Sequence, residues 1–328
     1  MSLIKQPSEI QEKKNLVMMI YGEPGQGKTT LALSCPSPVL IDTDGGVSRT
    51  LASHRCPTVQ VTSWEDVNGA LTEIASGPFK TIVVDTVGKL LDYMEEYIIR
   101  TDPKQRKRDG SLSISGYGVR KGMFRDFIKR CMLMGRNVVF VAHASEEKNG
   151  DDRMMRPIVG GSSMNDIMME LDLLGLMINI AGKRLIMWGN DGTTFAKSFY
   201  SKNTCFLPNV MEIPVVADAN GNTIAPNDFL SGVIDFYAKA QLKKEEINQE
   251  YGKLVESFKA RIAKVENAKQ LNALFKAITK EDHIYDSKLI AWNALNKKAK
   301  DLGLHYDKDE NKFASNESEQ PEVPAKSE

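Results

Sequence analysis

The stretch LVMMIYGEPGQGKTTLAL, residues 16–33, begins with a continuously apolar segment and continues through a glycine-rich turn. The residues after the turn have the apolar spacing of a helix. Residues 22–29 within it fit the pattern G-x-x-x-x-G-K-[ST] at every defined position. Glycines let backbone N–H groups wrap phosphate oxygens, and the following helix directs its positive N-terminus toward them. The alternative is a glycine-rich turn that happens to carry a lysine, which does not account for the strand before it and the helix after it. The stretch therefore predicts a nucleotide site.

The residue types of this loop predict separate roles. Lys28 is expected to neutralise the β- and γ-phosphates, and the Thr29 hydroxyl is expected to ligate Mg²⁺. The expected cofactors are therefore ATP and Mg²⁺. The predicted nucleotide-binding residues are Gly22, Glu23, Pro24, Gly25, Gln26, Gly27, Lys28, Thr29 and Thr30.

Two further apolar segments end in polar side chains that fit the same chemistry. TIVVD ends in Asp85, which we expect to hold Mg²⁺ through water; the alternative is a carboxylate that only caps the next helix. His143 follows the segment NVVFVA and is a candidate sensor of the γ-phosphate. A histidine in such a place is equally compatible with a purely structural role.

The segment VLIDTDGG, residues 39–46, places Asp42 and Asp44 at the end of another predicted strand. Ligands collect at the carboxyl ends of strands in open α/β sheets. We favour Asp44 as the carboxylate that orients the attacking water. The alternative is that both aspartates cap a turn completed by the two glycines that follow.

The alternation of apolar and helically spaced segments predicts a doubly wound α/β domain with a mainly parallel core sheet. Strands are expected at 16–21, 38–43, 81–85 and 137–142, and helices at 64–76, 86–99 and 119–135. An antiparallel extension is expected from the segments 171–180, 183–200 and 209–216, with Asn190, Asp191 and Gly192 as hairpin turn residues.

Composition predicts four regions. Residues 1–15 are polar and expected to be disordered, and 16–238 form the ATPase domain. Residues 239–313 are rich in Lys, Glu, Ala and Leu and predict a small helical module with a break at Asn267. Residues 314–328 are low in hydrophobicity and are expected to be a disordered tail.

The bulk composition narrows the class of protein. Formal net charge is zero, so a nucleic-acid surface has to be local. The four cysteines are scattered, without a pair at metal-ligand spacing, which favours a reduced intracellular protein. There is no apolar run of about 20 residues and no signal-peptide core, so we expect a cytoplasmic location and no membrane partner.

Taken together, these segments resemble the RecA-type recombinase core, and more closely the phage RecA-like ATPases that act as single-strand annealing proteins. The resemblance covers about residues 16–210 and implies a RecA-like P-loop NTPase fold. It implies that Asp44 is the catalytic carboxylate and Asp85 the Walker B aspartate. His143 occupies the place of the sensor residue, which is usually glutamine in recombinases.

The resemblance also implies assembly. AKSFYSKNTCFLP lies where recombinases place lysines that reach the nucleotide of a neighbouring subunit, and Lys202 is the best match, although Thr204 replaces a second lysine. A homo-oligomer or filament is therefore expected. RPIVGGSSMNDIMMELDLLGLM, residues 156–177, resembles the second DNA-binding loop and its trailing helix and strand, including the pair Gly160 and Gly161.

Recombinases direct two loops at single-stranded DNA, which correspond here to residues 101–117 and 145–162. Residues 100–121 carry a cluster of Arg and Lys, glycines that predict mobility, and a tyrosine that can stack a base. The alternative is a solvated surface loop. The predicted DNA-binding residues are Arg106, Lys107, Arg108, Tyr117, Arg120, Lys121, Arg153 and Arg156.

The sequence thus predicts a slow, DNA-stimulated ATPase that binds single-stranded DNA and promotes annealing or strand pairing in phage recombination, in the host cytoplasm. A single-strand-binding protein is an expected further partner. One alternative is a nucleotide switch or loader that acts on a replication protein without binding DNA. Another is a small-molecule phosphotransferase, which the basic segment 100–121 does not favour.

Overall fold

The computed structural model describes residues 4–5, 10, 12–149, 152–159, 163–189, 195–198 and 207–315. The chain divides into two compact units, one formed by Lys13–Gln241 and the other by Met1–Glu12 together with Leu242–Glu328. Most of the two ends for which the sequence predicts disorder lies outside the described residues.

The first unit is built on one mixed sheet, which has nine strands among the residues described. The strand order is β3-β2-β4-β5-β1-β7-β8-β9, parallel from β3 to β7 and antiparallel at β8 and β9, with β6 paired antiparallel to β5. This confirms the predicted mainly parallel core with an antiparallel extension. The strands are β1 (Val17–Gly22), β2 (Pro38–Asp42), β3 (Thr58–Gln60), β4 (Thr81–Asp85), β5 (Asn137–Asn149), β6 (Asp152–Pro157), β7 (Leu173–Ile180), β8 (Lys183–Met187) and β9 (Val210–Glu212).

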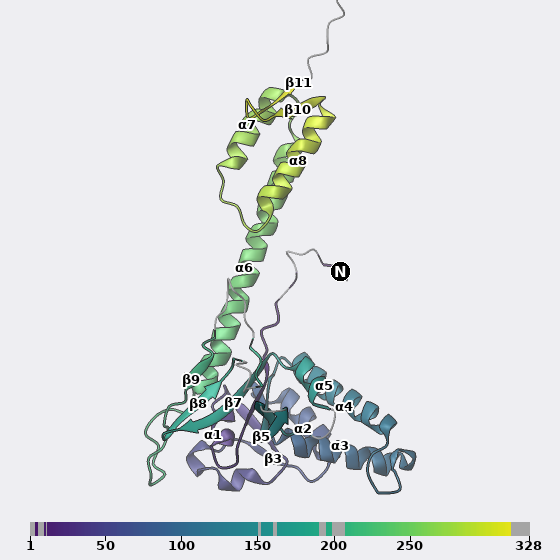
Figure 1. Cartoon of the computed structure of the whole chain (residues 1–328), viewed down its shortest axis with the longest axis vertical. Coiled ribbons are helices and arrows are strands. Elements are labelled where there is room, and N and C mark those ends of the chain that lie inside the picture. Colours follow the sequence, from purple (N-terminus) through teal and green to yellow (C-terminus); the bar gives the residue numbers. More distant parts are fainter. Residues whose placement is uncertain are drawn as a thin grey trace, which may run out of the picture. The chain divides into compact units, whose positions relative to one another are not determined.

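Helices cover both faces of this sheet, which explains why its central strands are continuously apolar (Figure 1). In β1, Met19 and Tyr21 pack against one face and Met18 and Ile20 against the other. The first face is covered by α2 (Trp64–Ser76), α3 (Val87–Thr101), α4 (Ile114–Leu133) and α5 (Ser163–Glu170); the second is covered by α1 (Lys28–Ala32) and the first turns of α6 (Phe229–Ala263).

The described part of the first unit also contains short 3-10 helices. They are η2 (Gly46–Arg49), η3 (Ala52–His54) and η4 (Pro103–Gln105). η2 follows β2, in the connection that contains the predicted catalytic Asp44. η4 follows α3, in the predicted first DNA loop.

Two predicted loops are more ordered than the sequence indicated. α4 begins at Ile114 instead of 119, because the Ser113 hydroxyl accepts a hydrogen bond from Gly116 N and caps the helix. Gly116 and Gly118 are therefore helical and do not supply the mobility expected of them. The predicted second DNA loop, 145–162, contains instead the hairpin of β5 and β6.

The helices and strands described in the second unit are the end of α6, α7 (Ala268–Thr279), α8 (Ser287–Asp301), β10 (Leu304–Asp307) and β11 (Lys312–Ser315). The predicted break at Asn267 is confirmed, since its side chain caps α7 by accepting from Gln270 N. The β10–β11 hairpin was not predicted, and it extends into the segment expected to be disordered from 314. Phe313 of this hairpin joins the core with Phe258, Leu271 and Leu295.

α6 runs without interruption through the predicted boundary at 238/239. Its sequence from 233 to 251 has neither glycine nor proline and is rich in strong helix formers, so no break is encoded there. None of the helices in the described part of the chain is both long and apolar enough to cross a membrane.

Candidate nucleotide site

The sheet brings the predicted chemical residues to one edge. Gly22 at the end of β1 pairs with His143 of β5, and Asp42 at the end of β2 pairs with Asp85 of β4. A cavity of about 410 Å³ opens at this edge. Four of the five predicted catalytic residues line it, while Lys202 lies outside the described residues. The full lining is Pro24, Gly25, Gly27, Lys28, Thr29, Thr30, Asp44, Gly46, Arg49, Thr50, Asp85 and His143.

The glycine-rich loop has the backbone that its sequence predicts. Gly25 and Gly27 have φ angles of 79° and 90°, a region that side chains disfavour. Lys28 is 6% exposed, and its Nζ donates a hydrogen bond of 2.7 Å to the Glu23 carbonyl across the loop. Burial lowers the Lys28 pKa, although Asp85, Asp44 and Glu23 oppose that shift. The Lys28 ammonium therefore lies over the loop and donates to a neutral carbonyl oxygen. A charged phosphate oxygen in the same place would be a stronger acceptor.

Thr29 and Asp85 lie in direct contact, with Thr29 Oγ1 donating to Asp85 Oδ2 at 2.5 Å. Burial raises the Asp85 pKa to about 6; Asp44 and Asp42 add to the rise, whereas Thr29 and Lys28 oppose it. A hydroxyl and a carboxylate are the hard oxygen donors that suit Mg²⁺, which keeps several waters and is usually held by one or two protein groups plus phosphates. In the described part of the chain no cluster of three or more His, Cys, Asp or Glu is placed to hold a metal ion.

The two aspartates after β2 have different surroundings. Asp42 is 2% exposed and accepts from Gly46 N at 2.9 Å and Val47 N at 3.1 Å, so it caps the turn into η2. Asp44 has a buried Oδ1 with no hydrogen-bond partner among the residues described, and its nearest cation is Arg49 Nη2 at 3.9 Å. The alternative raised from the sequence, a turn cap, thus applies to Asp42 alone. Asp44 retains a vacant acceptor at the cavity.

His143 also retains a buried ring nitrogen, Nδ1, without a hydrogen-bond partner within the described residues. Burial and the nearby Lys28 lower its pKa, which favours the neutral ring. Arg49 lines the same cavity, and sequence analysis missed it. The available signal was a basic residue shortly after the acidic strand end, which only the η2 turn brings back toward Asp44.

Three predicted DNA-binding residues, Arg106, Lys107 and Arg108, are exposed on the turn between α3 and α4. Lys107 N donates to Ser111 O at 2.8 Å and Gly110 has a φ of 87°, which closes the turn tightly. Figure 1 shows the end of α3 that leads into the turn well apart from α1. The basic turn is thus a surface separate from the nucleotide cavity.

Arg120 and Tyr117 do not fit the predicted DNA contacts. Arg120 is 3% exposed, and its Nη1 donates to Glu95 Oε2 at 2.7 Å. Its guanidinium also lies 4.8 Å from the centre of the half-buried Tyr117 ring, with Lys107 Nζ at 6.0 Å. Arg120 therefore joins α4 to α3, and the tyrosine ring already has cationic partners. Lys121 is half-buried beside them.

The two remaining predicted DNA contacts lie on the β6 strand of the hairpin. Arg153 pairs with Glu146 at 3.2 Å, and Arg156 pairs with Glu147 at 2.8 Å while stacking on Phe195. Each cation faces a carboxylate on β5, which lowers its attraction for phosphate. The predicted features Lys202, Thr204, Gly160, Gly161 and the turn at 190–192 lie outside the described residues.

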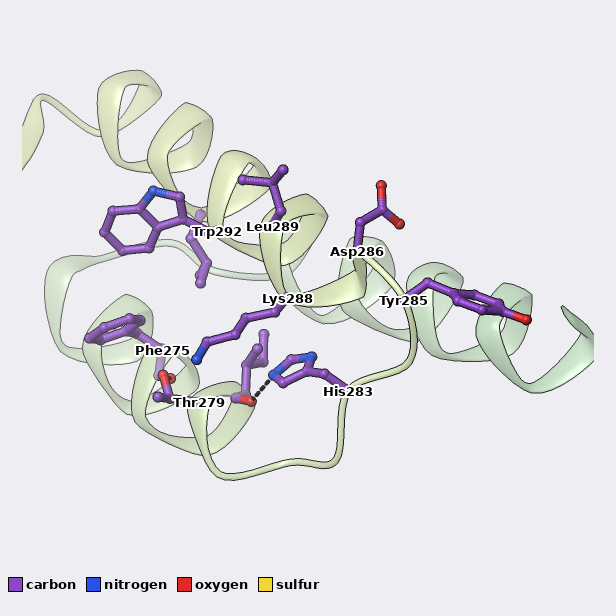
Figure 2. A pocket seen from close by; sticks show the side chains of 10 residues that line it. Phe275, Thr279, His283, Tyr285, Asp286, Lys288, Leu289 and Trp292 are labelled. Carbon is purple, nitrogen blue, oxygen red and sulfur yellow. Dashed lines mark hydrogen bonds between the residues drawn. The ribbon is translucent and has the colours of Figure 1, made fainter. Parts of the chain in front are cut away.

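The second unit has a cavity of its own, of about 490 Å³, between α7, α8 and the loop that joins them. Phe275, Trp292 and Leu289 form apolar walls, and Figure 2 shows Lys288 reaching across toward Thr279. His283 faces it from the loop and is tied to the Ile278 carbonyl at 3.0 Å. The lining is mainly apolar, and His283, Asp286 and Lys288 are its titratable members.

The phosphate loop, the strand-end aspartates and the mainly parallel sheet define a P-loop NTPase domain. A family model described as an AAA domain matches residues 14–200, more than half of the chain, and the chain therefore belongs to this family of P-loop ATPase domains.

A similar curated protein is the SPbeta prophage-derived uncharacterized protein YorG of Bacillus subtilis (strain 168). The two are 29% identical over 175 residues, which cover 49% of this chain and 51% of the relative. The chain thus spans about half the length of the curated relative that it matches.

Proposed function

We propose that the chain is an ATP-binding and ATP-hydrolysing protein that binds single-stranded DNA and promotes annealing or strand pairing in phage recombination. One observation carries the proposal. α3 begins two residues after Asp85 and ends at the exposed basic turn, so a single helix joins the nucleotide cavity to a cationic surface. A shift of the Asp85 strand end on nucleotide binding would be transmitted along α3 as a rigid element.

In the nucleotide site, Lys28 would pair with the terminal phosphates. Thr29 and Asp85 would hold Mg²⁺, which when bound neutralises developing phosphate charge. The vacant Asp44 Oδ1 would accept a hydrogen bond from the attacking water, and His143 would report the γ-phosphate through its unpartnered Nδ1.

On the DNA side, Arg106, Lys107 and Arg108 would contact backbone phosphates, because they are adjacent and exposed. ATP would shift the turn between weaker and stronger binding states through α3. The phage setting is supported by the relative YorG, which is prophage-derived. Assembly into a homo-oligomer or filament, with Lys202 reaching a neighbouring nucleotide, is part of the proposal, as is a single-strand-binding protein as partner.

A second candidate is a nucleotide switch or loader that acts on a replication protein without binding DNA. The apolar cavity of the second unit favours it, because Tyr285 and Leu289 at this cavity are 61% and 57% exposed (Figure 2). Exposed large apolar side chains around a hollow are typical of protein-binding surfaces.

ATP hydrolysis measured with and without single-stranded DNA separates these candidates. The proposal predicts a rate that rises with single-stranded oligonucleotide and not with duplex of the same length, and that is absent in Lys28→Ala with either. A hydrolysis rate that is unchanged by DNA, in a protein that also does not bind the oligonucleotide, would contradict the proposal and favour the nucleotide switch.

A further inference from the structure

Arg184, on β8, lies against the phosphate loop from the side opposite to the strand-end aspartates. A methyl group placed on Gly27 would lie 2.9 Å from Arg184 Nη1. The side chain is half-buried, yet across the described chain it makes no hydrogen bond or ion pair. A guanidinium presents five N–H donors in a fixed fork, which matches the oxygens of a phosphate group. Its position beside an anion-binding loop indicates an anionic ligand.

Arg184 also lines a narrow crevice that adjoins the nucleotide cavity. Gly27 and Thr30 line both spaces, so the crevice continues past the phosphate loop. Asn227 Nδ2 donates to the Thr30 carbonyl at 2.8 Å and fixes the far wall to α1. Arg184 is the one charged residue of a lining that is otherwise mostly aliphatic. The lining is Gly27, Thr30, Leu31, Met177, Arg184, Ile213, Pro214, Val216, Asn227 and Phe229.

The placement of the acidic residues gives a direction to a bound nucleotide. Asp44, Asp85 and His143 all line the main cavity and none lines the crevice. The γ-phosphate and Mg²⁺ therefore belong in the main cavity. The α-phosphate and the nucleoside must extend the other way, past Thr30 toward Arg184.

Resting on the proposed nucleotide site, we propose that Arg184 binds the phosphates nearest the nucleoside within the same chain, and that the mouth of the crevice takes the ribose and base. The crevice is too narrow to enclose a base, so the nucleoside lies across its mouth against Pro214. The ligand class is a nucleoside diphosphate or triphosphate. Arg184 keeps its contact after hydrolysis, because the product retains those phosphates.

Arg49 provides a matched contrast, since it lies in the main cavity near Asp44. Calorimetric titration of the full chain with ATP and with ADP tests the assignment. Arg184→Gln keeps the side-chain size and removes the charge. We expect it to lower the affinity for both ATP and ADP about tenfold or more. The affinities of Arg184→Lys should lie between those of the wild type and Arg184→Gln. Arg49→Ala should lower the affinity for ATP far more than the affinity for ADP. Lys183→Ala, on the same strand and pointing to Glu212, should match the wild type.

The nucleoside position is tested at the crevice mouth. Pro214 is exposed and lines the crevice, while Val215 is exposed and does not. Pro214→Asp should lower the ratio of the affinity for ATP to the affinity for inorganic tripolyphosphate. Val215→Asp should leave this ratio unchanged. A folded Arg184→Gln protein that binds ADP as the wild type does would overturn the role of Arg184. Equal effects of the two Asp variants would overturn the nucleoside position, and a wild type that binds no nucleotide would overturn the nucleotide site with both.

Discussion

Thr29 and Asp85 are 56 positions apart in sequence and are joined by a hydrogen bond of 2.5 Å from Oγ1 to Oδ2. The contact couples the phosphate loop to the strand that leads into α3. It also holds a buried carboxyl group whose pKa is raised, by burial first, to about 6.

The raised Asp85 pKa predicts a pH-dependent stability of the nucleotide-free protein. The folded state binds the proton more tightly than the unfolded state, whose pKa is near 3.8. This contribution is complete below about pH 4 and is lost as the pH rises through about 6. The loss is at most about 3 kcal/mol at neutral pH.

We therefore expect Asp85→Asn to be more stable than the wild type at pH 7.5 without nucleotide, with the gap closing toward pH 4.5. Urea unfolding at several pH values measures this. A gap that stays constant over this range would contradict the assignment. The same variant should lose Mg²⁺-dependent nucleotide affinity.

A second prediction concerns Lys28. Because its ammonium lies at the phosphate loop and donates to the neutral Glu23 carbonyl, Lys28→Ala should lose most ATP affinity while its thermal unfolding changes little. Lys89→Ala, an exposed substitution on α3, is the control. Titration with a fluorescent ATP analogue that gives equal affinities for the two variants would contradict the phosphate-loop assignment.

A third prediction separates the two aspartates after β2. Asp44→Asn should bind ATP as the wild type does and lose most turnover, because only the water-orienting acceptor changes. Asp42→Asn should instead destabilise the fold by about 1–3 kcal/mol, because a buried acceptor of two backbone N–H groups is disturbed. Steady-state hydrolysis and urea unfolding of both variants check this; normal turnover in Asp44→Asn would place the catalytic carboxylate elsewhere.

The sequence was sufficient for the parts of the fold that local chemistry encodes. The loop at 22–29 and the apolar strands predicted the parallel sheet and the meeting of Lys28, Asp44, Asp85 and His143, since the carboxyl ends of parallel strands share an edge. Arg49 and Arg184 escaped prediction, because only the η2 turn and the antiparallel pairing of β8 bring them to the loop.

Charge patterns were less informative. Arg106 and Arg120 look alike in sequence, and only the packing of α4 on α3 shows that one is exposed and the other is buried with Glu95. The β10–β11 hairpin was missed because short strands after a helical, lysine-rich segment carry little periodicity.

A fourth prediction follows from the burial of Arg120. Arg120→Ala leaves Glu95 without its partner and should destabilise the protein by about 3 kcal/mol, while the salt dependence of DNA binding stays unchanged. Thermal unfolding and an oligonucleotide titration at two salt concentrations test both parts. Wild-type stability combined with a flatter salt dependence would instead make Arg120 a phosphate contact.

The most direct test of the central claim is a polarisation titration of a labelled single-stranded oligonucleotide at several salt concentrations, with ATP present. Counterion release at the basic turn predicts that the logarithm of affinity falls steeply with the logarithm of salt concentration for the wild type. Replacing Arg106, Lys107 and Arg108 together with alanine should lower affinity and flatten that slope by up to about 2 units, at roughly 0.7 for each lost contact, with ATP binding unchanged. Identical affinity and slope in the wild type and the triple variant would contradict the account.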